Sequence, residues 1–106
     1  MIISGGFNVY AADIEVLLLK HSDVIDVAVI GVPSEQWGES PMALCVRRAG
    51  ATASEEAVRE WANAQLSKTQ RLVAVEFRDS LPRSTIGKIM KRELRAPYWE
   101  GRTARI

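Results

Sequence analysis

Apolar residues recur at helical spacing near the start of the chain. Ile14, Leu17 and Leu18 share one face of a stretch over 11–21. Because residues three and four apart lie on one side of a helix, this spacing predicts an amphipathic helix. The residues before it, 1–10, predict a short extended segment that a glycine turn interrupts.

Two longer apolar runs follow over 24–32 and 41–48, and the first is rich in Val and Ile. This composition is typical of buried strands. Pro33 ends the first run, and the polar segment 33–40 predicts a loop between the two. We expect the two strands to be antiparallel neighbours.

The second half of the chain predicts one helix and one strand before its basic end. Ser54 precedes two glutamates, as expected where a helix begins, and the helix is predicted over 54–67. A third strand is predicted over 72–77, parallel to the second if the two share a sheet, because a helix connects them. The inner face of the helix is expected to hold Val58, Trp61, Ala62 and Leu66.

The chain closes with a predicted basic helix over 88–95, which Pro97 ends, and a tail over 98–106. The element order is αββαβα. It predicts a small α+β domain, with a three-stranded mixed sheet packed against helices and a short N-terminal extended segment. A chain of 106 residues buries one modest core, so residues 1–106 are expected to form one domain.

Composition and charge exclude several classes of protein. The chain is 47% hydrophobic with a net charge of +1, which excludes disorder. Residues 83–106 nevertheless carry 7 basic and 2 acidic side chains. One hypothesis is therefore a free-standing module that binds nucleic acid through this end, although no aromatic residues alternate with the basic ones.

The single cysteine and the lack of long apolar runs indicate where the protein works. Cys45 lies in an apolar run, where a structural thiol is the ordinary interpretation, and it cannot form an intrachain disulfide. No apolar run approaches the ~20 residues of a membrane span. We expect a cytoplasmic protein with no membrane span and no metal site.

The segment from Ser4 to Asn8 is the first candidate site. Gly5 and Gly6 let the backbone approach a ligand closely and leave amide groups free to face it. The alternative is a tight turn before a helix. The pattern alone does not decide between the two.

The loop over 81–88 is the second candidate site. It presents hydroxyls, Gly87 and Lys88 on one turn, which suits a phosphate or a carboxylate. It lacks the spacing of a phosphate-binding P-loop. The alternative for Lys88 is a solvated lysine at the start of a helix.

Trp37 and His21 are two further side chains that could act in a site. Trp37 lies in a polar loop and could line a ligand site or plug the surface. His21 has no partner at the spacing of a metal site or a nucleophile. We interpret His21 as a residue at the end of a helix.

Taken together, four blocks resemble the C-terminal domain of the adenylate-forming enzymes, the superfamily of acyl-CoA synthetases, peptide-synthetase adenylation domains and luciferases. The resemblance covers the chain from end to end. Its blocks are, in order, Ile3–Tyr10 with Asp13, Ile14 and Glu15; Gly31–Pro33 with Trp37–Glu39; Val75–Phe77; and Leu81–Arg83 with Gly87–Ile89 and Lys91–Arg95.

The resemblance implies a mobile lid over a larger N-terminal adenylation domain of the same polypeptide. That enzyme converts a carboxylic acid, ATP (with Mg²⁺) and CoA into acyl-CoA, AMP and pyrophosphate. Lys88 would be the catalytic lysine that contacts ATP and the adenylate in the first step. Residues implied to face CoA in the second step are Ser4, Gly5, Gly6, Trp37 and Arg71.

The sequence also departs from the family pattern. Ala11 stands where a proline is common, and the segment 68–72 lacks the usual aromatic residue and proline. The motifs of the N-terminal domain are absent, so this chain alone is expected to be inactive and to hold no bound cofactor. The residues 7–10 and the pair Tyr98 and Trp99 favour a fatty acid-CoA ligase. A regulatory remnant that docks on a separate N-terminal domain is the other alternative.

Overall fold

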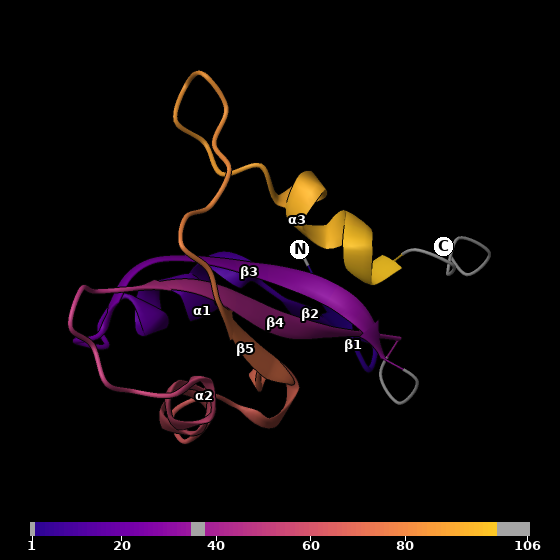
Figure 1. Ribbon diagram of the computed structural model, residues 1–106. Helices are drawn as coiled ribbons and strands as arrows, with labels where there is room; N and C mark the ends of the chain where they lie inside the picture. Colours follow the sequence, from indigo (N-terminus) through magenta and orange to yellow (C-terminus); the bar gives the residue numbers. More distant parts are fainter. Residues whose placement is uncertain (1, 35–37, 100–106) are drawn as a thin grey trace.

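A hairpin of two long strands organises the fold (Figure 1). The computed structural model describes residues 2–34 and 38–99. Strands β3 (Val24–Ser34) and β4 (Gly38–Arg47) pair antiparallel over their full length, which confirms the predicted pairing. The predicted loop over 33–40 was too long, because Pro33 continues β3. Since β3 is at the edge of the sheet, the missing N–H of a proline interrupts no pairing there.

The sheet has five strands, so the prediction of three was wrong. Strands β1 (Ile2–Ser4) and β2 (Phe7–Val9) form an antiparallel hairpin, and Ser4 pairs with Gly38 to join it to β4. Strands of three residues are too short to produce an alternating pattern in the sequence. Strand β5 (Ala74–Phe77) pairs with β4 in parallel, as predicted, so the sheet is mixed.

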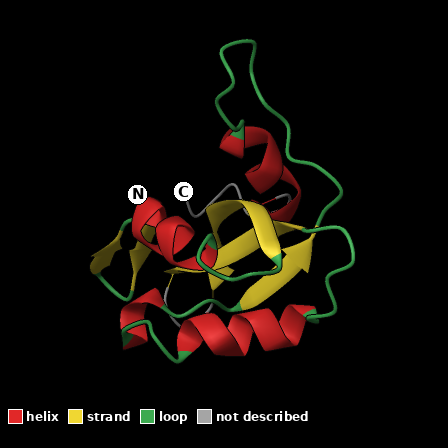
Figure 2. Cartoon of the chain, turned by 90° about the vertical axis from the view of Figure 1, so that its left-hand side faces the viewer, coloured by secondary structure: helices red, strands yellow, loops and turns green. Residues whose placement is uncertain are grey.

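Helices cover both faces of the sheet, because β3 and β4 are apolar on both sides. Helices α1 (Ala11–Leu18) and α2 (Glu55–Asn63) pack on one face with Val27, Val29 and Cys45. Helix α3 (Lys91–Trp99) packs on the opposite face with Ile30 and Leu44. Alternate residues of a strand point to opposite faces, so each strand contributes to both cores. Figure 2 shows α2 and α3 on opposite sides of the sheet.

The start of α2 was predicted correctly, whereas the ends of α1 and α2 were not. The Ser54 hydroxyl accepts a hydrogen bond from the amide of Ala57 at 3.1 Å, the cap expected from the sequence. The helix ends at Asn63 and not near Ser67. Ser67 instead caps a separate short 3-10 helix, η1 (Lys68–Gln70).

The final helix is shifted toward the C-terminus relative to its prediction over 88–95. It begins at Lys91, because the preceding residues fold back through a bridge between Arg83 and Ile89. It also continues through Pro97, which was expected to end it. The Trp99 indole donates to the carbonyl of Gly31 at 2.8 Å and so ties the last turn of α3 to β3.

Side chains form hydrogen bonds with backbone groups along the open edge of β3. The amide of Val29 donates to a carboxylate oxygen of Glu15 at 2.8 Å, and the carbonyl of Gly31 accepts from Arg95 and Trp99. An open strand edge is a template for unwanted pairing, and these contacts block it. No helix among the described residues is long and apolar enough to cross a membrane.

Candidate functional site

The glycine hairpin, β1 and β2 with the turn between them, places one candidate loop at the edge of the sheet. Gly5 and Gly6 form its turn with φ angles of 59° and 85°, a region in which other residues are strained. Ser4 is 4% exposed, whereas Phe7 is 61% exposed. The glycines therefore form a tight turn in which the backbone has no side chains over it.

Arg71 and Ser4 line the same cleft, although the two residues are far apart in the sequence. Both line a cleft of about 410 Å³ between the glycine hairpin, α2 and η1. We call it the Arg71 cleft. It is lined by Ser4, Ser40, Arg59, Asn63, Lys68, Thr69, Arg71, Leu72 and Val73.

The Arg71 cleft contains two further cations, Arg59 and Lys68, that no motif in the sequence indicated. Arg59 pairs with Glu56 on the surface of α2, and that contact lowers the pKa of Glu56. Among the described residues, Lys68 and Arg71 form no ion pair. Lys68 and Arg71 are three residues apart, which is one turn of a 3-10 helix. This spacing becomes meaningful only once η1 is known. The cleft therefore offers unpaired positive charge suited to an anion.

Asn63 holds the chain segment that follows Arg71. Its side-chain amide donates to the carbonyl of Leu72 at 3.0 Å, and its side-chain oxygen accepts from the amide of Leu72 at 2.8 Å. Such a reciprocal pair mimics a backbone pairing. The pair of hydrogen bonds fixes the backbone of Leu72, the residue after Arg71, against α2.

Lys88 lies on a loop that projects from the body of the domain (Figure 1, orange). We call residues 82–90 the lysine loop. The amide of Ser84 donates to the carbonyl of Lys88 at 2.8 Å, and the amide of Met90 donates to that of Pro82 at 2.9 Å. Gly87 turns the chain with a φ angle of 87°. The loop is thus a narrow hairpin with the exposed Lys88 near its tip.

A hollow of about 630 Å³ lies beside the lysine loop. It is lined by Glu15, Arg83, Gly87, Lys88, Ile89 and Lys91. Of its cations, Arg83 pairs with Asp26 at 2.6 Å and Lys91 pairs with Glu15 at 2.7 Å. Among the described residues Lys88 has no ion-pair partner, so it carries the unpaired charge of this hollow.

The two candidate loops do not meet. The lysine loop and the glycine hairpin lie on different sides of the domain in both Figure 1 and Figure 2. They line separate hollows, so the domain presents two distinct surfaces. Trp37, the other residue expected to face CoA, lies outside the described residues.

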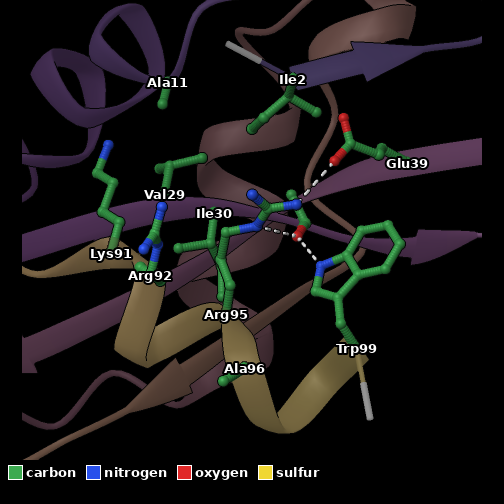
Figure 3. A pocket seen from close by; sticks show the side chains of 11 residues that line it. Ile2, Ala11, Val29, Ile30, Glu39, Lys91, Arg92, Arg95, Ala96 and Trp99 are labelled. Atoms are coloured by element: carbon green, nitrogen blue, oxygen red, sulfur yellow. Dashed lines mark hydrogen bonds and ion pairs between the residues drawn. The ribbon is translucent and has the colours of Figure 1, made fainter. Parts of the chain in front are cut away.

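A third cleft, of about 490 Å³, lies between α3, α1 and β3 (Figure 3). Arg95 pairs with Glu39 at 3.2 Å and lies over the ring of Trp99 at 5.3 Å. Glu39 also accepts from the amide of Ile3 at 2.9 Å. These contacts hold α3 and β1 to the sheet.

The ion pairs also bear on the nucleic-acid hypothesis. Three of the cations in the basic segment pair with carboxylates from α1, β3 and β4. A cation that is already paired contributes less to binding phosphate. The described part of the basic segment therefore does not form a continuous cationic face.

The remaining titratable groups have structural positions. His21 accepts from the amide of Asp23 at 3.0 Å and meets the ring of Trp61 edge-on. Burial raises the pKa of Cys45 to about 12, as fits an inert thiol. Burial and a hydrogen bond to Glu76 raise the pKa of Tyr98. Among the described residues, no three His, Cys, Asp or Glu side chains form a group that could hold a metal ion.

Comparison with known proteins identifies the domain. The family model described as "AMP-binding enzyme C-terminal domain" matches residues 13–88. The chain is 41% identical over 95 residues to 2-succinylbenzoate–CoA ligase of Geobacillus kaustophilus, covering 90% of this chain and 19% of that protein. It is 38% identical over 108 residues to medium/long-chain-fatty-acid–CoA ligase FadD8 of Mycobacterium tuberculosis, covering 95% and 19% respectively.

The fold agrees with the sequence comparison. The crystal structure of ATP-bound MatB from Rhodopseudomonas palustris superposes with a TM-score of 0.86 at 42% identity, covering 92% of this chain and 20% of that one. The chain thus spans about a fifth of the length of each relative. The family match begins within α1 and ends at Lys88, so it contains β3, β4 and β5 with the buried residues that they contribute to both cores. This chain belongs to the family of AMP-binding enzyme C-terminal domains.

Proposed function

We propose that this chain is the C-terminal lid of an ATP-dependent acyl-CoA synthetase, covalently joined to a larger N-terminal adenylation domain. The whole enzyme would join a carboxylic acid to CoA with conversion of ATP to AMP and pyrophosphate. The observation that carries the proposal is the position of Lys88, an unpaired cation near the tip of a projecting loop. Such a lysine can enter an active site that the lid closes.

In the first step the Lys88 ammonium would bridge the substrate carboxylate and the α-phosphate region of ATP. Two anions must approach each other there, so a positive charge between them offsets their repulsion and stabilises the transition state. The described residues offer Mg²⁺ no group of ligands. We therefore assign the Mg²⁺ that accompanies ATP to the larger domain.

In the second step the lid would turn and bring the glycine hairpin to the active site. Gly5 and Gly6 add no side-chain bulk, so a pantetheine arm could pass close to the backbone. Arg71, in the cleft next to Ser4, would contact the nucleotide phosphates of CoA. Trp37 would line the same passage. Because the two surfaces of the lid are distinct, each would serve one half-reaction.

We further propose a fatty or related carboxylic acid as the substrate and the cytoplasm as the location. The support is the sequence of residues 7–10 and the similarity to FadD8. Another relative is named for 2-succinylbenzoate, so similarity in this domain is compatible with different acids. The acyl pocket would lie in the larger domain.

The test separates the two half-reactions in the full-length polypeptide. We expect Lys88→Ala to slow formation of the acyl-adenylate by about a hundredfold, with little effect on thioester formation from preformed adenylate. Arg71→Ala is expected to do the reverse, raising the KM for CoA and leaving adenylation unchanged.

Lys20→Ala is the matched control, because Lys20 is an exposed lysine with no ion-pair partner among the described residues. It should change neither half-reaction. Equal losses of both half-reactions in Lys88→Ala would overturn the assignment.

A further inference from the structure

We propose that Asp26 and Glu15 are positioning residues for Lys88, a role that rests on the proposed function of that lysine. Each carboxylate binds a cation at one end of the lysine loop, Arg83 within it and Lys91 directly after it. Asp26 belongs to β3 and Glu15 to α1, so the two anchors lie in the packed body of the domain. Together they would fix where the loop leaves the body.

Asp26 anchors the leg that precedes Lys88. A side-chain nitrogen of Arg83 lies 2.6 Å from a carboxylate oxygen of Asp26, and a second nitrogen of Arg83 donates to the carbonyl of Gly87 at 3.4 Å. The guanidinium thus connects the sheet to the turn that carries Lys88. A planar group with several donors suits such a bridge better than a lysine would.

Glu15 anchors the leg that follows Lys88. Its carboxylate pairs with Lys91, the first residue of α3, at 2.7 Å. The same carboxylate oxygen accepts from the amide of Val29 at 2.8 Å, so its own position is held by the edge of β3. Figure 3 shows Lys91 extending from α3 toward α1.

The two carboxylates also determine which cations beside the loop are paired and which is free. Arg83, Lys88 and Lys91 line one hollow, and the first and third have carboxylate partners. Lys88 is therefore the cation left free for a substrate anion. Loss of either carboxylate would leave a second free cation close to Lys88, able to compete for the same anion.

We expect these two ion pairs to contribute little to the free energy of unfolding. Both are partly exposed, and exposed pairs contribute little to stability. The lysine loop has no strand pairing beyond the bridge between Arg83 and Ile89. A lysine near the tip of such a loop requires fixed legs if its ammonium is to reach one position reproducibly.

The experiment compares Asp26→Asn and Glu15→Gln in the full-length polypeptide. Glutamine keeps an oxygen that can accept from Val29, so the edge of β3 remains satisfied. We expect each variant to lower kcat for adenylation by about tenfold, with an unchanged rate of thioester formation and an unchanged thermal unfolding midpoint. Asp26→Glu, which retains the charge, should recover much of the loss.

Asp13→Asn is the matched control, because it removes one negative charge from α1 at an exposed position that lines none of the three hollows described above. It should leave adenylation unchanged. The double variant Asp26→Asn with Lys88→Ala should be no slower than Lys88→Ala alone, since a positioning residue acts only through the lysine.

The outcomes separate the two proposals. If Lys88→Ala slows adenylation but Asp26→Asn and Glu15→Gln do not, the positioning role is wrong and the proposed function stands. Additive losses with Lys88→Ala also overturn the positioning role. If Lys88→Ala itself has no effect, both proposals fail.

Discussion

The β3–β4 hairpin and the lysine loop are both built from two chain segments running in opposite directions, yet they are held in different ways. β3 and β4 pair over their full length and are covered by helices on both faces. The lysine loop has one bridge, a few backbone hydrogen bonds and two ion pairs at its legs. If Lys88 has the proposed role, stability and chemistry therefore belong to different hairpins of one domain.

This separation has a physical basis. Burial of apolar surface stabilises the sheet, and it requires that side chains be shielded from solvent. A lysine that must reach a substrate held by another domain has to stay exposed. Changes in the sheet should therefore alter the free energy of unfolding, and changes in the loop should alter the reaction.

The largest expected contrast comes from removing an apolar side chain in each hairpin. Leu44 is fully buried between the sheet and α3, whereas Ile86 in the lysine loop is 84% exposed. We expect Leu44→Ala to lower the free energy of unfolding by about 2–5 kcal/mol and Ile86→Ala by less than about 0.5 kcal/mol. Urea unfolding followed by circular dichroism measures both. Similar losses would contradict the comparison.

A smaller effect, per pH unit, is expected from the thiol of Cys45 in the sheet. Burial raises its pKa from 9.0 to about 12, so in this range the unfolded chain ionises while the folded chain does not. Its contribution to stability is complete below pH 9.0 and is lost as the pH rises toward about 12. The loss is about 1.4 kcal/mol per pH unit within that window.

Urea unfolding at pH values on either side of 9.0 checks this prediction, with Cys45→Ala as the reference. The reference has no thiol, so its stability should fall less steeply with pH. Identical slopes for the two proteins would show that the thiol is accessible to solvent in the folded state.

A modest effect on stability, and the sharpest test of the lysine loop, is expected from Gly87→Ala. Gly87 has a φ angle of 87°, and a Cβ there would meet nothing within 4 Å, so the cost is backbone strain alone. We expect a loss of about 1–2 kcal/mol, because the left-handed backbone conformation costs a residue with a Cβ about that much. Adenylation should nevertheless slow, since the turn carries Lys88.

Gly50→Ala is the matched control for this prediction. Gly50 follows β4 with a φ angle of 82° and equally open surroundings. Its substitution should cost a similar free energy and leave adenylation unchanged. Equal slowing by both variants would mean that the conformation of the lysine loop has no special importance.

Several features were predictable because their signals are local. The apolar runs over 24–32 and 41–48 predicted the two central strands, and Ser54 predicted the start of α2. Hydrophobic patterning and helix capping depend on residues a few positions apart. The family resemblance likewise depended on short blocks in a fixed order, and the family match agrees with it.

Other features were decided by contacts between distant segments. The extension of β3 through Pro33, the addition of β1 and β2 to the sheet and the continuation of α3 through Pro97 each depend on partners far along the chain. No local pattern contains those partners. The strand and helix ends predicted from the sequence therefore lie several residues away from the ends that packing produces.

By itself the sequence determined the strand-rich centre, the helix that Ser54 caps and the two loops that we propose as functional sites. Only the tertiary structure brought Arg71 beside Ser4, placed the lysine loop on a different side of the domain and paired Asp26 and Glu15 with its legs. The reason is that propensity and periodicity act only between residues that are close in the sequence. The environment of a charge depends on neighbours in space, which only the folded chain brings together.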